Sequence, residues 1–397
     1  MASWTREEFE VALAAYGHII SPKDAPADIA YAAAIVKMLE SDYRGDSEFL
    51  AFSERLPVLV FKEKLKPDGI KTKVRFNIES KRHKNIITEI ASGNVGTVYS
   101  GSAEFDTGLN IYKKIVLTKD LNKSIREVFL ETWIQTVLSL DASMVDKIGK
   151  VRGLYRAAPA AAVGAGGAGG PAPSPSVTLY IVMEPAGMPL KTIISRPFTF
   201  ITMKPIYREL GILLQHLQRK YGFYHRDLHR GNVLRKDDSI SLIDFGESVI
   251  KKWDGLGTYR STAYDGALGP EGPYSLHSSF DLLKFLTSMI DYHADEMTEE
   301  HKGLLIEIIG KDIFASIRRI AGKRIDDSGD PDYLFWQTSP SAYSRFTGPE
   351  AATTGLIMAN PTLRPAGFID YLDHHKGGGR KIRKTQKKKN RGTRGRR

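Results

Sequence analysis

The order of its secondary-structure patterns limits what this chain can fold into. Between residues 85 and 184, short runs rich in β-branched and aromatic residues surround one amphipathic helical segment, SIREVFLETWIQTVLSL. After residue 200, apolar residues recur at helical spacing, as in PIYRELGILLQHLQRKY and SSFDLLKFLTSMIDYH. A sheet-rich part followed by a helix-rich part predicts an α+β protein.

The regions outside this pattern differ in composition. Residues 1–84 are expected to form a helical accessory region, because Thr5 and Glu8 match a capping box and IAYAAAIVKMLES has helical spacing. The main domain is expected at residues 85–375. Within it, residues 157–176 consist mainly of Ala, Gly and Pro without charge, which predicts a flexible insertion.

The positive charge of the chain is concentrated at its C-terminus. The net charge is +11, but residues 376–397 hold twelve Lys and Arg residues and no acid, so the remainder carries −1. This segment has no apolar periodicity, which predicts a disordered basic tail. Such a tail could bind nucleic acid, a membrane or an acidic partner, could serve as a nuclear signal, or could simply keep the chain soluble.

The composition also excludes several classes of protein. The chain has no cysteine, which rules out disulfides, thiol catalysis and Cys-ligated zinc. No apolar run approaches the roughly 20 residues that span a bilayer, and MASWTREEFE does not resemble a signal peptide. We therefore expect an intracellular protein without a transmembrane segment, in the cytoplasm or the nucleus.

Two motifs offer groups suited to moving phosphate. In YHRDLHRGNVL, Asp227 could accept the proton of a substrate hydroxyl and Asn232 could bind a divalent metal ion. Twelve residues after Asn232, LIDFGES presents Asp244 as a second metal ligand, behind an apolar run that predicts a buried strand. Phosphoryl transfer requires such a positioning base and metal site, together with a cation for the remaining phosphates.

The two motifs resemble the catalytic and metal-binding loops of the protein-kinase superfamily. The resemblance implies a two-lobed α+β fold with a small β-rich N-lobe at residues 85–184 and a larger helical C-lobe at residues 187–375. It also implies transfer of the γ-phosphate of ATP, with Mg²⁺ or Mn²⁺ held by Asn232 and Asp244. The resemblance covers about residues 85 to 375.

The segment IASGNVGTVY resembles the glycine-rich loop over the ATP phosphates. Ala91 replaces the first glycine, whereas Gly93 and Gly96 are kept. Glycines would let backbone N–H groups approach phosphate, and Val98 would contact the nucleotide from the following strand. An ordinary glycine hairpin is the alternative interpretation of this segment.

A lysine and a glutamate complete the resemblance on the nucleotide side. Lys113 in IYKKIV and Glu131 on the following helix are similar to the family's ion pair, whose lysine contacts the α and β phosphates. Lys114 would point to the opposite face of the strand. We favour Lys113, because Lys114 would place Tyr112 where the family keeps a small residue beside adenine; Glu127 stays open as the partner. The implied catalytic set is Lys113, Glu131, Arg226, Asp227 and His229.

The segment YIVMEPAG resembles the hinge between the two lobes. It would place Met183 at the back of the nucleotide pocket, although plain core packing explains this residue equally well. Glu184 and Ala186 would offer backbone groups to adenine.

Three downstream positions are similar to those of kinases that act on proteins. Asp281 resembles the helix aspartate that supports the catalytic loop, and Glu271 and Arg364 resemble a buried ion pair of the helical lobe. They imply an activation segment from Asp244 to Glu271 that contains Thr258, Ser261 and Thr262. Arg226 could bind a phosphate placed on that segment.

The residues His229 and Gly231 keep other functions open. They give the catalytic loop a D-L-H-x-G-N pattern similar to that of aminoglycoside and choline kinases, and of the atypical protein kinase haspin. His229 stands where many protein kinases carry a lysine that contacts the transferred phosphate; it either replaces that lysine or packs within the loop. A non-enzymatic pseudokinase scaffold is a further alternative, which Ala91 favours.

The sequence therefore predicts an ATP-dependent protein kinase that phosphorylates Ser or Thr of protein substrates and itself, with tyrosine specificity open. Gly followed by a Lys- and Arg-rich C-terminus is similar to the ends of many proteins of large DNA viruses. A virus-encoded kinase, active in the host cell or carried in the virion, is a hypothesis that rests on residues 376–397 alone.

Overall fold

The structure has the α+β composition that the sequence predicts. The computed structural model describes residues 4–21, 26–40, 46–65, 71–78, 81–82, 87–92, 96–102, 109–117, 124–157, 177–194, 198–260, 277–293, 295–311, 314–315 and 360–375. Apart from Ala157, which ends a strand, the expected insertion at 157–176 lies outside the described residues, as does the basic tail at 376–397.

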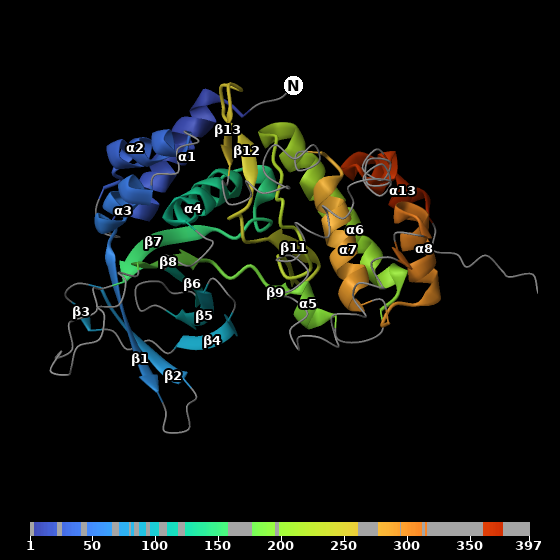
Figure 1. Ribbon diagram of the computed structural model, residues 1–397, viewed down its shortest axis with the longest axis horizontal. Helices are drawn as coiled ribbons and strands as arrows, with labels where there is room; N and C mark the ends of the chain where they lie inside the picture. The colour runs from blue at the N-terminus through green and yellow to red at the C-terminus, as the bar shows by residue number, and fades with distance from the viewer. Residues whose placement is uncertain are drawn as a thin grey trace, which may run out of the picture.

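One large sheet contains most of the strands (Figure 1). Its strands are β1 (Val58–Leu65), β2 (Lys71–Ile78), β3 (Lys81–Arg82), β4 (Ile87–Ser92), β5 (Gly96–Ser102), β6 (Leu109–Leu117), β7 (Val151–Ala157) and β8 (Val177–Met183). They are ordered β3-β2-β1-β7-β8-β6-β5-β4. Strands β4 to β8 pair antiparallel with their neighbours, whereas β1 pairs parallel with β7. The strands predicted from residue 86 onward are thereby confirmed.

The N-terminal region is only partly helical, so the expectation of helices throughout residues 1–84 is wrong. Helices α1 (Arg6–Ile20), α2 (Ile29–Leu39) and α3 (Asp46–Glu54) are present, and Thr5 caps α1 as predicted. Strands β1 to β3 follow and extend the sheet. The physical reason is visible in KTKVRFNI, the sequence of β2, where apolar residues alternate with polar ones at the period of a strand and not of a helix.

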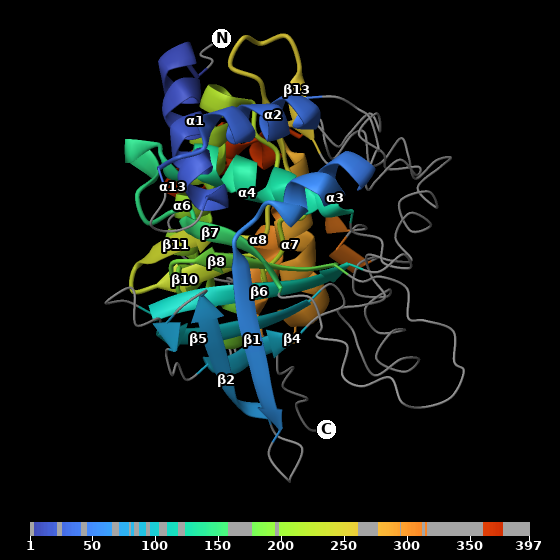
Figure 2. The ribbon, with the colours of Figure 1, turned by 90° about the vertical axis from the view of Figure 1, so that its left-hand side faces the viewer.

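Helix α4 (Ile125–Ser139) is the most enclosed helix of the described chain. Every residue from Ile125 to Leu138 is buried, because the sheet lies on one side and helices α1 to α3 cover the other (Figure 2). Tyr16 of α1 donates a hydrogen bond to the carbonyl oxygen of Phe129 at 3.1 Å. The helix is therefore held by the N-terminal region as well as by the sheet.

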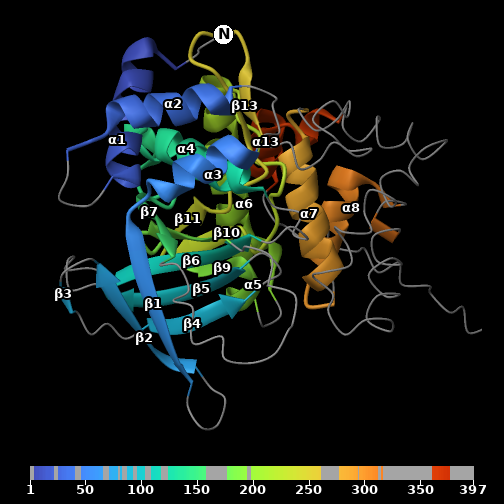
Figure 3. The same cartoon turned by 60° about the vertical axis from the view of Figure 1, so that its left-hand side comes forward.

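The rest of the described chain is mainly helical, and its short strands lie between these helices and the large sheet or beside α4 (Figures 1 and 3). The helices are α5 (Leu190–Ile193), α6 (Phe200–Tyr221), α7 (Phe280–His293), α8 (Glu299–Ile309) and α13 (Pro365–His374). The short strands are β9 (Met188–Pro189), β10 (Val233–Lys236), β11 (Ser239–Leu242), β12 (Val249–Lys251) and β13 (Thr258–Arg260). No helix in the described ranges is both long enough and apolar enough to cross a membrane.

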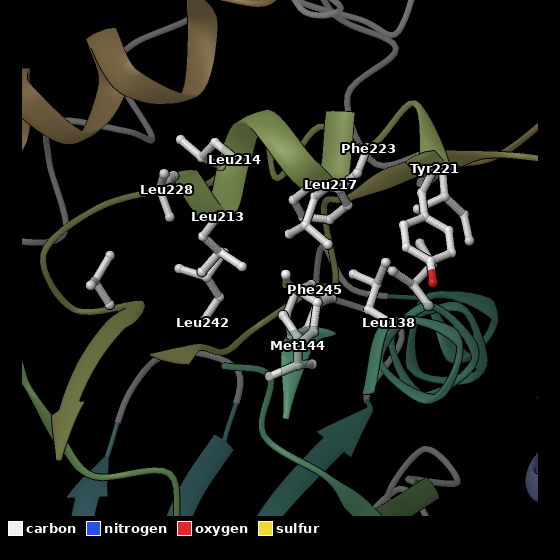
Figure 4. Close-up of a cluster of buried hydrophobic side chains, with 14 of the residues drawn as sticks. Leu138, Met144, Leu213, Leu214, Leu217, Tyr221, Phe223, Leu228, Leu242 and Phe245 are labelled. Carbon is white, nitrogen blue, oxygen red and sulfur yellow. The ribbon is translucent and has the colours of Figure 1, made fainter. Parts of the chain in front are cut away.

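Buried apolar side chains connect α6 to the end of α4 (Figure 4). Leu213 and Leu217 of α6 point toward Leu242, Phe245 and Leu138, and Leu138 belongs to α4. All five side chains are buried. A continuous apolar core therefore runs from the helical part, past the strand that precedes Asp244, to α4.

We expect the Trp133→Ala substitution to lower the free energy of unfolding by about 3–5 kcal/mol, because it opens a cavity in a close-packed core. The Trp133 ring is fully buried and packs against the rings of Phe9, Tyr16 and Tyr259, which come from α1 and β13. Denaturant unfolding measures the loss. The control is Ile201→Ala on the exposed side of α6, which should change the free energy by less than about 0.5 kcal/mol. A loss below about 1 kcal/mol for Trp133→Ala would contradict this packing.

Candidate functional site

The loop from His225 to Asn232 is fixed by a buried carboxylate on α7. Asp281 is fully buried, and it accepts hydrogen bonds from the backbone N–H groups of His225 at 2.9 Å and Arg226 at 2.8 Å. Burial raises the pKa of the Asp281 carboxyl above its ordinary value, although both N–H donors favour the charged form. Arg226 has a φ of +64°, a strained conformation for a residue with a side chain. Asp281 thus stabilises the turn that sets the direction of Asp227.

Asp227 is held by groups on both of its carboxylate oxygens. Lys284 of α7 donates to Oδ1 at 2.6 Å, whereas Oδ2 lies 3.3 Å from the Asn232 amide nitrogen and 3.7 Å from Nε2 of His229. Burial acts to raise the pKa of Asp227, but the charge and the hydrogen bond of Lys284, with a contribution from His229, outweigh it and lower that pKa below its ordinary value. The side chain keeps 23% of its surface exposed, which leaves it within reach of a substrate group.

The His229 ring both packs in the loop and faces Asp227. Its Nδ1 accepts a hydrogen bond from the Gly231 N–H at 2.9 Å, so that nitrogen carries no proton and the ring hydrogen belongs on Nε2. Burial lowers the pKa of His229, against the opposing effect of Asp227. One ring nitrogen therefore contacts the loop, as the packing interpretation predicts, and the other faces the Asp227 carboxylate. Contact of His229 with a transferred phosphate stays a prediction.

The β10–β11 hairpin brings Asn232 and Asp244 to one end of the same pair of strands. Val233 and Leu242 are partners in this hairpin, and the Ile243 N–H donates to the Asn232 carbonyl at 3.1 Å. The Asn232 amide nitrogen donates to the Asp227 carbonyl at 2.9 Å, which turns its oxygen the other way. Asp244 follows Ile243 in the sequence and has a φ of +65°, a conformation that is uncommon for a residue with a side chain.

Asn232 and Asp244 fit a magnesium ion that is shared with phosphate. No group of three or more His, Cys, Asp or Glu side chains in the described part of the chain could form a protein-only metal site. Mg²⁺ is usually held by one or two protein oxygens, and phosphate and water complete its coordination. One amide oxygen and one carboxylate match that requirement.

The Phe245 side chain anchors the segment that carries Asp244. It is fully buried, with its ring centroid 6.0 Å from that of Phe223 and 5.4 Å from that of His225. On the other side of Asp244, the Ile243 carbonyl lies 3.0 Å from Nε2 of His225. Contacts on both sides thus fix the backbone at Asp244.

The Lys113 ammonium lies between two carboxylates from different elements. It donates to Glu131 of α4 at 2.5 Å and to Asp244 at 2.9 Å. Glu131 is 1% exposed, so its charge depends on such a partner. Glu127 has another role: its side chain accepts from the Ser124 N–H and closes the capping box of α4. Glu131 is therefore the α4 residue that binds Lys113.

The register of β6 explains why Lys113 and not Lys114 reaches this position. Lys113 pairs with Val98 of β5 and Ile181 of β8. Lys114 alternates to the opposite face, which it shares with Tyr112. Tyr112 packs there in a separate cluster with the other aromatic and aliphatic side chains Leu59, Tyr99, Tyr180 and Val182.

The segment expected to cover phosphate forms the hairpin of β4 and β5. Ala91 of β4 pairs with Val98, which in turn pairs with Lys113, so three strands bring these positions into one row. Gly96 begins β5. Gly93 lies outside the described residues.

The segment after β8 leaves two backbone groups for a ligand. Met183 ends β8 and is buried. The Glu184 N–H donates to the Lys150 carbonyl at 2.8 Å, and the Ala186 carbonyl accepts from the Ser241 hydroxyl at 2.8 Å. Among the described residues, none bonds the Glu184 carbonyl or the Ala186 N–H. One acceptor and one donor are what the edge of an adenine ring requires.

Part of the expected activation segment is described. Thr258 lies half-buried in β13, whereas Ser261, Thr262 and Glu271 lie outside the described residues, so the Glu271–Arg364 pair stays a prediction. The expected phosphate ligand, Arg226, is buried.

Lys284 is the site residue that the sequence analysis missed. It follows Asp281 by three positions in FDLLKFL, and residues three apart lie on the same face of a helix. A lysine on the face that already carries a buried aspartate was therefore a usable signal.

Comparison with known proteins adds no assignment: no family model matches the chain, and no curated protein is significantly similar to it.

Proposed function

We propose that the protein is an ATP-dependent protein kinase with a two-lobed, kinase-like fold. The large sheet and α4 would form the N-lobe, and the helices from α5 onward would form the C-lobe, so that the main domain covers residues 85–375. The observation that carries the proposal is the contact of one ammonium, that of Lys113, with both Glu131 and Asp244. It joins the three segments whose motifs resemble kinase sequences.

The arrangement supplies each group that phosphoryl transfer requires. Lys113, oriented by Glu131, would bind the non-transferred phosphates of ATP. Asn232 and Asp244 would hold Mg²⁺ or Mn²⁺, which neutralises charge on the phosphates when bound. Asp227 would orient the acceptor hydroxyl and take its proton. Such positioning and charge stabilisation account for most of the catalysis of this reaction.

The segment from Met183 to Ala186 offers groups that suit an adenine base. The Glu184 carbonyl and the Ala186 N–H would bond the base, with Met183 behind it. Ala91, Gly93, Gly96 and Val98 would cover the ribose and phosphates, and the row from Ala91 to Lys113 supports this assignment for the part of the hairpin that is described.

The contact of Asp281 on α7 with the backbone of the Asp227 loop favours a protein as the phosphate acceptor. Asp281 holds the turn at Arg226, and sequence resemblance associates that aspartate and Arg364 with kinases that act on proteins. We propose Ser or Thr as the acceptor residue. Separately, we propose that the basic tail binds nucleic acid or an acidic partner. His229 beside Asp227 favours a second candidate, phosphorylation of a small molecule, because that motif resembles aminoglycoside and choline kinases.

Asp227 is the proposed base of the reaction. Wild-type protein incubated with radiolabelled ATP and Mg²⁺ should label itself or a generic basic protein, and Asp227→Asn should lower the rate by at least about 100-fold, because the amide cannot accept the proton. The matched control is Asp254→Asn, an exposed aspartate in the β12–β13 turn, which should keep the wild-type rate. Equal labelling by wild type and Asp227→Asn would overturn the assignment of Asp227.

Lys113 is the proposed ligand of the non-transferred phosphates. Lys113→Met should lower kcat/KM for ATP by about 100-fold, the size of effect expected from removing one preorganised charge. Lys114→Met, on the opposite face of the same strand, should stay within about threefold of wild type. Steady-state kinetics over a range of ATP concentrations measures both. The reverse order of effects would show that Lys114 is the phosphate ligand.

A further inference from the structure

Lys284 is a buried cation in the candidate site. It projects from α7 and is 4% exposed. Its ammonium donates to Oδ1 of Asp227 at 2.6 Å and to the carbonyl oxygen of Arg226 at 2.7 Å. Burying an ammonium is costly unless charged or polar partners compensate for the lost water. The compensation for Lys284 comes from the residue proposed as the base and from its neighbour.

The loop backbone has other anchors on α7. Asp281 accepts from the N–H groups of His225 and Arg226, and the Ser288 hydroxyl accepts from the Arg230 N–H at 3.1 Å. The distinctive contact of Lys284 is therefore the one with the Asp227 carboxylate. A lysine needed only to hold the loop would not have to reach that side chain.

Position 229 of the loop does not supply a fixed cation beside Asp227. His229 occupies the position where many protein kinases carry a lysine, but its Nδ1 accepts the Gly231 N–H and so carries no proton. The ring can offer one N–H through Nε2, at 3.7 Å from Oδ2 of Asp227. The ammonium that contacts Asp227 comes instead from α7.

We propose that Lys284 is a positioning residue of the phosphotransfer site, and that its ammonium supplies to Asp227, from α7, a positive charge that His229 does not supply from the loop. It binds Oδ1 of Asp227, so that Oδ2, whose contacts at 3.3 and 3.7 Å are longer, faces the acceptor hydroxyl. This inference rests on the proposed kinase function. It assigns a role to Lys284, which the sequence motifs do not. It also assigns different roles to the two carboxylate oxygens of Asp227: Oδ1 is held by Lys284, and Oδ2 takes part in the reaction.

The test removes the lysine at position 284 and introduces a lysine at position 229. Three proteins are compared: wild type, Lys284→Met, and the double variant His229→Lys/Lys284→Met, which places a lysine at the loop position. The matched control is Lys147→Met, because Lys147 is likewise an ion-paired lysine; it is partly buried and is bound to Glu209 away from the site. The measurements are kcat and KM for ATP, with thermal unfolding to compare the amounts of folded protein.

We expect Lys284→Met to lower kcat by about 100-fold while KM for ATP stays within about threefold, because nucleotide contacts are untouched. Lys147→Met should keep the wild-type kcat. The double variant should regain at least about tenfold in kcat over Lys284→Met, since a charge at position 229 can again bind Asp227. A purely structural lysine would not be rescued from that position.

Other results would overturn the role of Lys284, the proposed function, or both. A folded Lys284→Met with kcat within threefold of wild type, or an inactive double variant that is folded, overturns the role of Lys284 and leaves the proposed function intact. If Lys284→Met does not fold, Lys284→Gln replaces it, because its amide can still donate to Asp227 without charge; the same loss is expected and full activity overturns the proposal. Wild-type protein that transfers no phosphate to any acceptor or to water overturns both.

Discussion

The ammonium of Lys113 holds three parts of the chain in one arrangement. It contacts Glu131 of α4 and Asp244 at the end of the β10–β11 hairpin, and it projects from β6 of the large sheet. Because Glu131 is buried, losing this contact would remove a cation that compensates a buried carboxylate, so the contact couples the three parts energetically. The candidate site exists only while sheet, helix and hairpin keep these relative positions.

The packing of α4 explains how this arrangement is maintained. The N-terminal helices cover the side of α4 that the sheet leaves open, and the Arg126 side chain donates both to Leu39 of α2 and to Arg260 of β13. Trp133 packs against rings of α1 and β13. At the other end, Phe245 connects the core of α6 to α4 (Figure 4). The region we expected to be accessory therefore stabilises the helix that carries Glu131.

Local sequence signals predicted much of the fold and of the candidate site. The capping residues of α1, the strands from β4 to β8 and the neighbouring positions of Lys113, Glu131 and Asp244 all follow from short motifs. Strands β1 to β3 were missed because a helical pattern was extended past its end. Lys284 was missed although its spacing from Asp281 was a usable signal, because its partner, Asp227, lies 57 residues away in the sequence and the spacing alone does not name that partner.

A comparison of phosphate acceptors tests the central claim most directly. The protein would be incubated with ATP and Mg²⁺ together with a protein mixture, aminoglycosides, choline or sugars, and the phosphorylated products identified by mass spectrometry. Our account predicts phosphate on Ser or Thr of proteins, including this chain, at rates that Asp227→Asn abolishes. Phosphate found only on a small molecule, or on no acceptor at all, would contradict it.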